Sequence, residues 1–263
     1  MLDLPQIDPV IIKVGPLAIR WYGLMYLLGF VGSFFYMQYL ARLRKFALSS
    51  DDVSDLIFYG VFGVILGGRF GYCLFYNFKY YSRAPLEILY VWQGGMSFHG
   101  GLLGVCCAVV LFCYRRQKSI LELGDLAAAA APIGLGFGRI GNFINGELWG
   151  RVTDVPWGIV FPGAGPLPRH PSQLYEALLE GIVLFLLLWF AHKKSIWRGG
   201  VIFLFLTGYG LSRTVVELFR QPDEHLGFLW GNFTMGQLLS TPMIVIGLLG
   251  LFWTYRRSTH DAD

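Results

Sequence analysis

Residues 138–151 read GRIGNFINGELWGR and place two arginines, two asparagines and a glutamate among four glycines, directly after an apolar run. Arginine keeps its charge at any working pH and binds a phosphate through two parallel hydrogen bonds. Glycines expose backbone N–H groups to the same anion. Arg139 is therefore a candidate for binding a phosphate and for stabilising its charge as it leaves.

A second set of polar residues repeats at helical spacing. Tyr209, Arg213, Glu217 and Arg220 are separated by four, four and three positions, which puts them on one face of a helix. One interpretation is a chain of structural salt bridges at a helix end. The other is an arginine that its neighbours hold toward a polar cavity.

His99 lies in MSFHGGLLG, where two glycines follow it and a helix is predicted to begin. This setting lets backbone approach a ligand, although a lone histidine also suits a structural role. The preceding GMSF is similar to the GxSx motif of intramembrane serine proteases, whose serine needs a histidine from another helix as its base. The remaining histidines fall in predicted loops or the tail, which disfavours a protease: His170, His192, His225 and His260.

The composition shows what must position these residues. Of 263 residues, 55% are hydrophobic and 14% charged, whereas soluble domains carry about 25% charged residues. We predict an all-α integral membrane protein, one polytopic domain over 1–263 with seven transmembrane helices. The net charge of +4 requires no nucleic-acid partner, and no metal motif is present. The predicted spans are 18–40, 53–76, 97–114, 121–138, 172–191, 200–219 and 234–255.

Loop charges set the expected orientation, because short cytoplasmic loops are rich in Lys and Arg. Four alternate segments carry this charge, so the N-terminus is expected to face outward and the C-terminus to be cytoplasmic. The outer side then holds a small head at 139–171. The basic residues are Arg42, Arg44, Lys45, Arg115, Arg116, Lys118, Lys193, Lys194, Arg198, Arg256 and Arg257.

This topology gathers the intramembrane polar residues in the outer half of the bilayer. A charge at the bilayer centre costs about 2.5–3.5 kcal/mol on insertion scales, so such residues are functional candidates. The set indicates a protein that handles outer-leaflet phospholipids, as an enzyme, a transporter or a lipid-binding scaffold. Its members are Tyr22, Arg69, His99, Arg139, Glu176, Glu180, Arg213 and Glu217.

Two further patterns concern packing. Gly63, Gly67 and Gly71 recur every four residues, which predicts a close helix–helix contact. The four cysteines all fall in apolar segments without metal-ligand spacing, so we expect small buried hydrophobic residues: Cys73, Cys106, Cys107 and Cys113.

Several segments resemble one known family. GRIGNFINGELWGR closely resembles the signature of bacterial prolipoprotein diacylglyceryl transferases, and HGGLLG resembles that family's histidine motif. RHPSQLYEA, YGLSRTVVELFRQPDE and IRWYGLMY also look like family segments. The matches run in the expected order from about residue 18 to the last span.

The resemblance implies a seven-span enzyme of the bacterial inner membrane that uses no metal or organic cofactor. It would transfer diacylglyceryl from phosphatidylglycerol to the lipobox cysteine of a prolipoprotein, forming a thioether and releasing glycerol 1-phosphate. Other partners would be membrane lipids. By motif match, Arg139 and Arg213 are essential, Asn142 and Gly150 are important motif positions, and His99 and Tyr22 are functional. Glu147, Tyr209, Glu217 and Arg220 align with further site residues, and Arg69 joins the expected lipid-binding set through its depth.

A mechanism follows as an expectation. A thiol with a pKa of about 8.5 is mostly protonated at neutral pH, so it needs a base or a cationic field. His99 is the candidate base because arginine cannot deprotonate, although the arginines alone would also stabilise a thiolate. Glu147 and Glu217 would orient arginines. The alternative is a phospholipid transporter or flippase, which should place polar residues in both leaflets.

Overall fold

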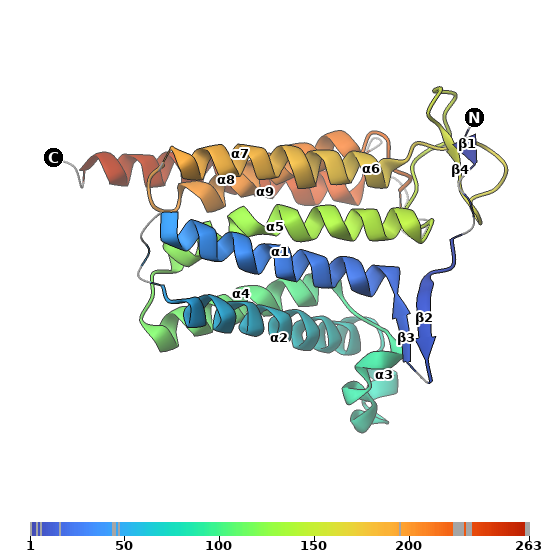
Figure 1. The fold of residues 1–263 in the computed structure, drawn as a ribbon, viewed down its shortest axis with the longest axis horizontal. Helices are drawn as coiled ribbons and strands as arrows, with labels where there is room; N and C mark the ends of the chain where they lie inside the picture. The colour runs from blue at the N-terminus through green and yellow to red at the C-terminus, as the bar shows by residue number, and fades with distance from the viewer. Residues whose placement is uncertain are drawn as a thin grey trace. The chain divides into compact units, whose positions relative to one another are not determined.

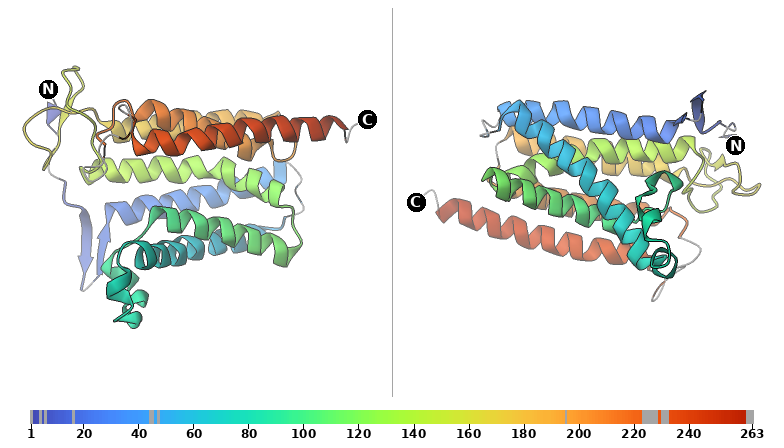
Figure 2. Two further views of the ribbon diagram at one scale, coloured as in Figure 1. Left: turned by 180° about the vertical axis from the view of Figure 1, so that it is seen from behind. Right: turned by 90° about the horizontal axis from the view of Figure 1, so that it is seen from below.

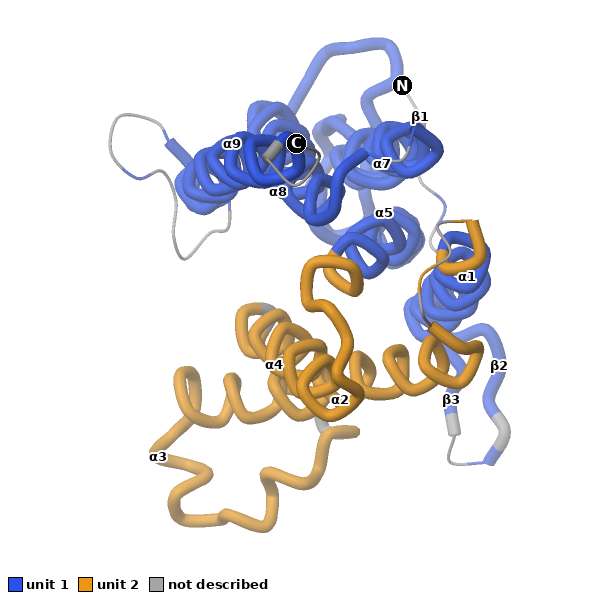
Figure 3. The backbone as a smooth tube through the Cα atoms, turned by 90° about the vertical axis from the view of Figure 1, so that its left-hand side faces the viewer, with its two compact units in different colours: residues 1–40, 125–263 blue, residues 41–124 orange. Residues whose placement is uncertain are grey.

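A computed structural model describes residues 2–3, 5, 7–15, 17–43, 46, 48–194, 196–222, 229 and 233–260. The basic residues Arg44 and Lys45, and His225, therefore lie outside the described residues. The chain forms two compact units, residues 1–40 with 125–263 (unit 1) and residues 41–124 (unit 2), coloured separately in Figure 3.

Unit 1 is built from helices that lie alongside one another (Figure 1). Helices α8 and α9 make the most extensive contact within it and lie side by side in every view (Figure 2). Residues Ser172–Lys193 form one continuous helix whose middle part, η3, is a π-helix. The elements are most of α1 (Trp21–Leu43) and of α5 (Ile120–Ile144), then α6 (Ser172–Glu176), η3 (Ala177–Val183), α7 (Leu184–Lys193), α8 (Gly200–Val216) and α9 (Met235–His260).

Unit 2 consists of α2 (Ser50–Phe75) packed on α4 (Phe98–Arg116), with short turns of helix between them. The glycine stripe predicted for close packing is confirmed. A Cβ on Gly63 would lie 2.6 Å from the carbonyl oxygen of Gly104, and one on Gly71 would lie 2.8 Å from Cα of Gly100. The short elements are α3 (Phe78–Tyr81), η1 (Pro85–Leu89) and η2 (Val91–Gln93).

Among the residues that the structure describes, five helices are long and apolar enough to cross a membrane. They overlap the predicted spans 18–40, 53–76, 121–138, 172–191 and 234–255. The predicted spans 97–114 and 200–219 correspond to α4, of 19 residues, and α8, a shorter apolar helix of 17 residues. The chain therefore has the helices of a multi-pass membrane protein, while seven crossings and the orientation stay predictions.

The fold is mainly helical, as predicted, and short strands occur in the segments before α1 and after α5. Strand β1 (Leu2–Asp3) pairs in parallel with β4 (Ile159–Val160), and β2 (Val10–Val14) pairs antiparallel with β3 (Leu17–Arg20) just before α1. Gly15 sits in the β2–β3 turn with a φ of +61°, a conformation that glycine adopts without steric cost. Strands this short leave no mark on a hydropathy window of helical length.

The fourth predicted span is too short, because α5 continues to Ile144. The polar residues after position 138 suggested a loop, yet residues 139–144 form the last turns of the helix. Arg139 and Asn142 therefore project from a helix, three positions apart and on the same face.

Burial of the cysteines agrees only in part with the prediction. Cys73 and Cys113 are buried, whereas Cys106 and Cys107 are exposed on α4. Exposed positions on an apolar helix suit contact with lipid chains, as do exposed Leu27, Phe35 and Leu249 elsewhere.

Candidate functional site

The centre of the site depends on a close approach between α5 and η3. A Cβ on Gly181 would lie 2.9 Å from Cα of Gly136, so position 181 needs glycine for the helices to come this close. Arg139 follows Gly136 by three residues on α5, and Glu180 adjoins Gly181. The glycine contact therefore brings the arginine to the carboxylates of the facing helix. π-Helices are rare and occur frequently at functional sites.

Three arginines and three glutamates from α5, α6, η3 and the end of α8 form one ion-pair cluster in unit 1. Glu176 bridges its neighbours, since Oε2 lies 3.1 Å from Nε of Arg139 and Oε1 accepts a 2.6 Å hydrogen bond from Nη1 of Arg213. Nη1 of Arg220 donates to the same Oε1 at 3.1 Å. Arg213 also pairs through Nη2 with Glu217, one helical turn away.

Glu180 lies between the same two arginines but holds them more loosely. Its Oε2 is 3.6 Å from Nη2 of Arg139, and its Oε1 is 3.7 Å from Nη1 of Arg213. Both Glu176 and Glu180 are fully buried, whereas the side chains of Arg139 and Arg213 remain 19% and 14% exposed. The most accessible side chains of the cluster are therefore those of two arginines, which are backed by buried carboxylates.

Neighbouring residues hold this cluster in place. Tyr209 precedes Arg213 by one turn of α8, and its hydroxyl is within electrostatic range of Glu180, Arg213 and Arg139. Glu217 packs on the start of α9, where a Cβ on Gly236 would lie 2.9 Å from Cγ of Glu217.

A second polar group forms one turn further along α5. The Asn142 amide donates a 2.9 Å hydrogen bond to Oε1 of Glu147, and the Asn145 amide donates to the same oxygen at 3.3 Å. Tyr22, in the first turn of α1, packs against Gly141, where a Cβ would come within 2.9 Å of its ring. The Tyr22 hydroxyl interacts with the Asn142 side chain and with Tyr26, whose hydroxyl is 3.1 Å away. Tyr22, Asn142 and Glu147, predicted as site residues, are thus neighbours.

Gly150 links the signature segment to the end of α8. Its N–H donates to the carbonyl of His170 at 2.9 Å, and the next N–H, of Arg151, donates to Phe219 at 2.8 Å. Gly150 and Arg220 form an isolated antiparallel bridge. A Cβ at Gly150 would lie 2.6 Å from the His170 oxygen and 2.7 Å from that of Phe219, which explains why this position takes glycine.

His170 lies outside the spans, beside this bridge. Its ring contacts Phe219 and Tyr175, and its Nδ1 is 3.1 Å from the Tyr175 hydroxyl. Burial lowers the pKa of His170 below its usual value, opposed by the charge of Asp154. The neutral imidazole is therefore the form that suits the folded protein.

Arg151 is a site-supporting residue that the sequence analysis missed. Its guanidinium donates to the carbonyls of Arg220 at 3.0 Å and Glu217 at 3.1 Å. Glu176 and Glu180 were recognised as intramembrane charges but were left out of the expected site, although they form its centre. Their four-residue spacing, which puts both on one side of a helix, was the available signal.

His99 and Arg69 belong to unit 2. His99 is exposed in the first turn of α4, where the Ser97 hydroxyl caps the helix by accepting from the Gly100 N–H at 3.2 Å. This capping bond gives Ser97 a structural role. The place of His99 in the site stays a prediction.

Arg69 is almost fully buried, and its guanidinium donates hydrogen bonds to backbone carbonyls of the 85–95 segment. It donates to the carbonyls of Ile88 at 2.8 Å, Gly94 at 2.5 Å and Glu87 at 2.6 Å, and it stacks on Tyr81. This arrangement favours anchoring of a loop over binding of a lipid.

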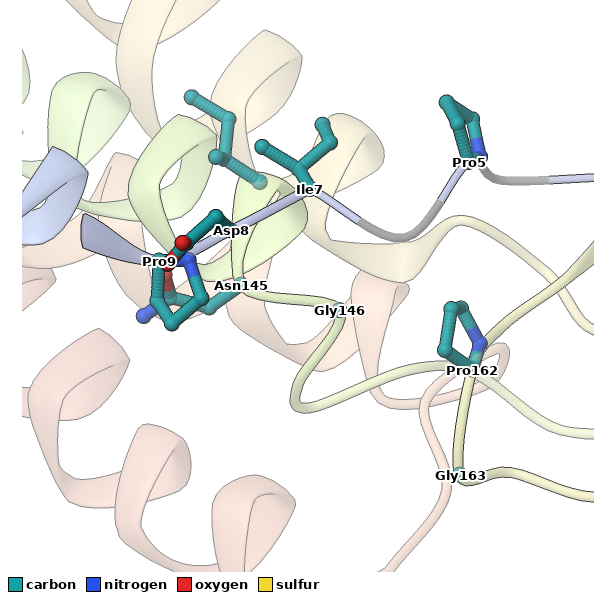
Figure 4. Close-up of a pocket in the computed structure, with 9 residues that line it drawn as sticks. Pro5, Ile7, Asp8, Pro9, Asn145, Gly146, Pro162 and Gly163 are labelled. Atoms are coloured by element: carbon teal, nitrogen blue, oxygen red, sulfur yellow. The ribbon is translucent and has the colours of Figure 1, made fainter. Parts of the chain in front are cut away.

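A cavity of about 540 Å³ lies near the end of α5 (Figure 4). It is lined by the segment around Asp8, by Ile144–Gly146 and by Pro162–Gly163, and none of the clustered arginines lines it. Asn145 contributes to its wall and also donates to Glu147, so the cavity borders the second polar group rather than the ion-pair cluster.

Comparison with known proteins adds an independent finding. The family model described as prolipoprotein diacylglyceryl transferase matches residues 9–253. Proteins named phosphatidylglycerol--prolipoprotein diacylglyceryl transferase are similar over nearly their whole length. The one from Pseudoalteromonas translucida is 56% identical over 98% of this chain and 97% of its own. That of Geobacter sulfurreducens is 57% identical over 94% and 95%, and that of Coxiella burnetii 54% over 97% and 98%.

Proposed function

The chain belongs to the prolipoprotein diacylglyceryl transferase family, and from this membership we infer that it is an enzyme that transfers diacylglyceryl from phosphatidylglycerol to a prolipoprotein. The name of the relatives states both substrates, phosphatidylglycerol and a prolipoprotein. The acceptor is the thiol of the lipobox cysteine, which follows an apolar signal segment and so reaches the membrane surface. The relatives' names give no support to a transporter or flippase.

The reaction exchanges one bond at a glycerol carbon. The cysteine sulfur attacks the carbon that bears the phosphate ester, a C–S bond forms and the C–O bond breaks. The electron pair of that bond leaves with the oxygen of glycerol 1-phosphate, and the thiol proton passes to a base. Negative charge thus builds on the phosphate as it leaves, and fixed positive groups at that position accelerate the step.

One observation carries the assignment of the phosphate site. Arg139 and Arg213 come from helices distant in sequence, yet both are paired with the same two buried carboxylates. Ion pairing restricts the guanidinium groups before substrate arrives, and both arginine side chains remain partly exposed. We assign the phosphodiester to this pair, with Arg220 and Glu217 as supports.

The second polar group suits the other end of the headgroup. Tyr22, Asn142 and Glu147 offer a hydroxyl, an amide and a carboxylate close together, and such groups bind alcohol hydroxyls. We assign the glycerol headgroup of phosphatidylglycerol to them, because Asn142 lies one helical turn from Arg139. His99 is the proposed base for the thiol, and the membrane is proposed to be the bacterial inner membrane with this site toward the periplasmic leaflet.

A transfer assay tests the function. Purified protein is mixed with phosphatidylglycerol and a lipobox peptide, and a peptide in which serine replaces the cysteine is the control. Mass spectrometry is expected to find a diacylglyceryl adduct on cysteine and an equal amount of glycerol 1-phosphate. Binding of both substrates without any adduct would end the enzyme assignment.

A further inference from the structure

Glu180 is set apart from the other acidic residues of the cluster by its lack of hydrogen bonds. Both of its carboxylate oxygens are buried, and neither has a hydrogen-bond partner among the residues that the structure describes. Ion pairing to Arg139 and Arg213 at 3.6 and 3.7 Å is what holds it. Glu176, by contrast, accepts hydrogen bonds from Arg213 and Arg220.

The position of Glu180 resembles that of a ligand. One of its oxygens faces each of the two guanidinium groups, as the two unesterified oxygens of a phosphodiester would. The carboxylate and the phosphodiester also each carry a single negative charge that is spread over two oxygens. A buried carboxylate without hydrogen bonds is poorly stabilised. A phosphate therefore displaces it from its arginine partners more easily than it would displace a carboxylate with a full set of hydrogen bonds.

The charge of the cluster bears on the same point. Arg139, Arg213 and Arg220 contribute three positive charges, and Glu176, Glu180 and Glu217 contribute three negative ones, so the formal sum is zero. An incoming phosphodiester would bring the sum to −1. A carboxylate in the cluster therefore weakens phosphate binding by charge repulsion. Glu180 is the candidate, because it is loosely held and pairs with the two arginines assigned to the phosphate, Arg139 and Arg213.

We propose that Glu180 is a positioning residue that acts as a releasable internal counter-ion. Before lipid arrives it keeps Arg139 and Arg213 each paired with one oxygen of the same carboxylate. When phosphatidylglycerol binds, the guanidinium groups turn from Glu180 to the phosphate, and after transfer Glu180 competes with the product for them. This inference rests on the proposed function, in that it assumes a phosphate ligand at this pair.

The test is the binding of phosphatidylglycerol without any peptide acceptor, so that no transfer occurs. The variant Glu180→Gln keeps the shape of the side chain and removes its charge. We expect the Kd for phosphatidylglycerol to fall about tenfold, since a like charge near the phosphate is lost. The Kd for diacylglycerol, which has the same chains without phosphate, should not change. In the transfer assay kcat should fall, because glycerol 1-phosphate leaves more slowly.

Two further variants separate this role from simple structural support. Glu176→Gln removes hydrogen-bond acceptors of Arg213 and Arg220, so it should weaken phosphatidylglycerol binding. Asp55→Asn, in the exposed pair with Arg116 of unit 2, should leave the Kd unchanged. Unchanged or weaker phosphatidylglycerol binding by folded Glu180→Gln, with wild-type binding intact, would overturn the counter-ion role. Failure of the wild-type protein to transfer would instead overturn the proposed function.

Discussion

Gly150→Ala probes how the signature segment is anchored to the end of α8. The added Cβ would lie 2.6 Å from the carbonyl oxygen of His170 and 2.7 Å from that of Phe219. Both obstacles are backbone atoms, so the segment has to move away. Overpacking of this kind costs about 1–3 kcal/mol, and separating Gly150 from His170 and Arg151 from Phe219 loses about 1 kcal/mol for each hydrogen bond.

These figures combine to about 3–5 kcal/mol, or a shift of roughly a hundredfold or more away from the anchored state. Because the same segment leads back to Glu147, and Arg151 binds the carbonyls after Arg213, we expect the transfer rate to fall by a similar factor. Thermal unfolding and steady-state transfer would be measured together. Gly60→Ala on α2 is the matched control, because a Cβ added there would meet no other atom within 4 Å. Wild-type turnover and unfolding midpoint in Gly150→Ala would refute the reasoning.

Three other predictions address the histidines and Arg69. His99→Asn should slow transfer mainly at lower pH, where little thiolate forms unaided, and an unchanged shape of the pH profile would count against its role as base. For His170 the folded-state pKa is lowered, so the unfolded chain binds the proton more readily and stability falls as pH drops through about 6.5. Thermal melts should show a smaller loss in His170→Gln than in wild type, and equal losses would contradict this. Arg69→Gln should lower the unfolding free energy by about 3 kcal/mol or more through unsatisfied carbonyls without changing the Kd for phosphatidylglycerol, whereas lost binding at full stability would restore Arg69 to the lipid site.

The helices themselves were predictable because apolar runs and their ends are local properties of the sequence. The end of α5 was not, since GRIGNF has the composition of a loop. The segment makes tertiary contacts that its composition does not reveal, such as Gly141 against Tyr22. The strands before α1 were missed for a related reason, because their pairing extends over only a few residues.

The sequence analysis singled out the arginines of the ion-pair cluster and Glu217, but it left Glu176 and Glu180 out of the expected site. Arg139 and Arg213 stood out by their chemistry, but the sequence could not show that one pair of carboxylates, Glu176 and Glu180, binds both. The close approach of Gly150 to Phe219 likewise joins segments far apart in the chain. Arg69 had the right residue type and depth, yet its donors are taken up by nearby carbonyls.

The central claim is that Arg139 and Arg213 together bind the phosphate that leaves. Its most direct test is the single-turnover transfer rate of Arg139→Lys and Arg213→Lys at saturating phosphatidylglycerol and peptide, with Arg115→Lys in unit 2 as the conservative control. Lysine keeps the charge but loses the planar two-point grip, so each site variant should slow transfer about a hundredfold or more, while the control transfers at the wild-type rate. Near-normal single-turnover rates in both site variants would contradict the account.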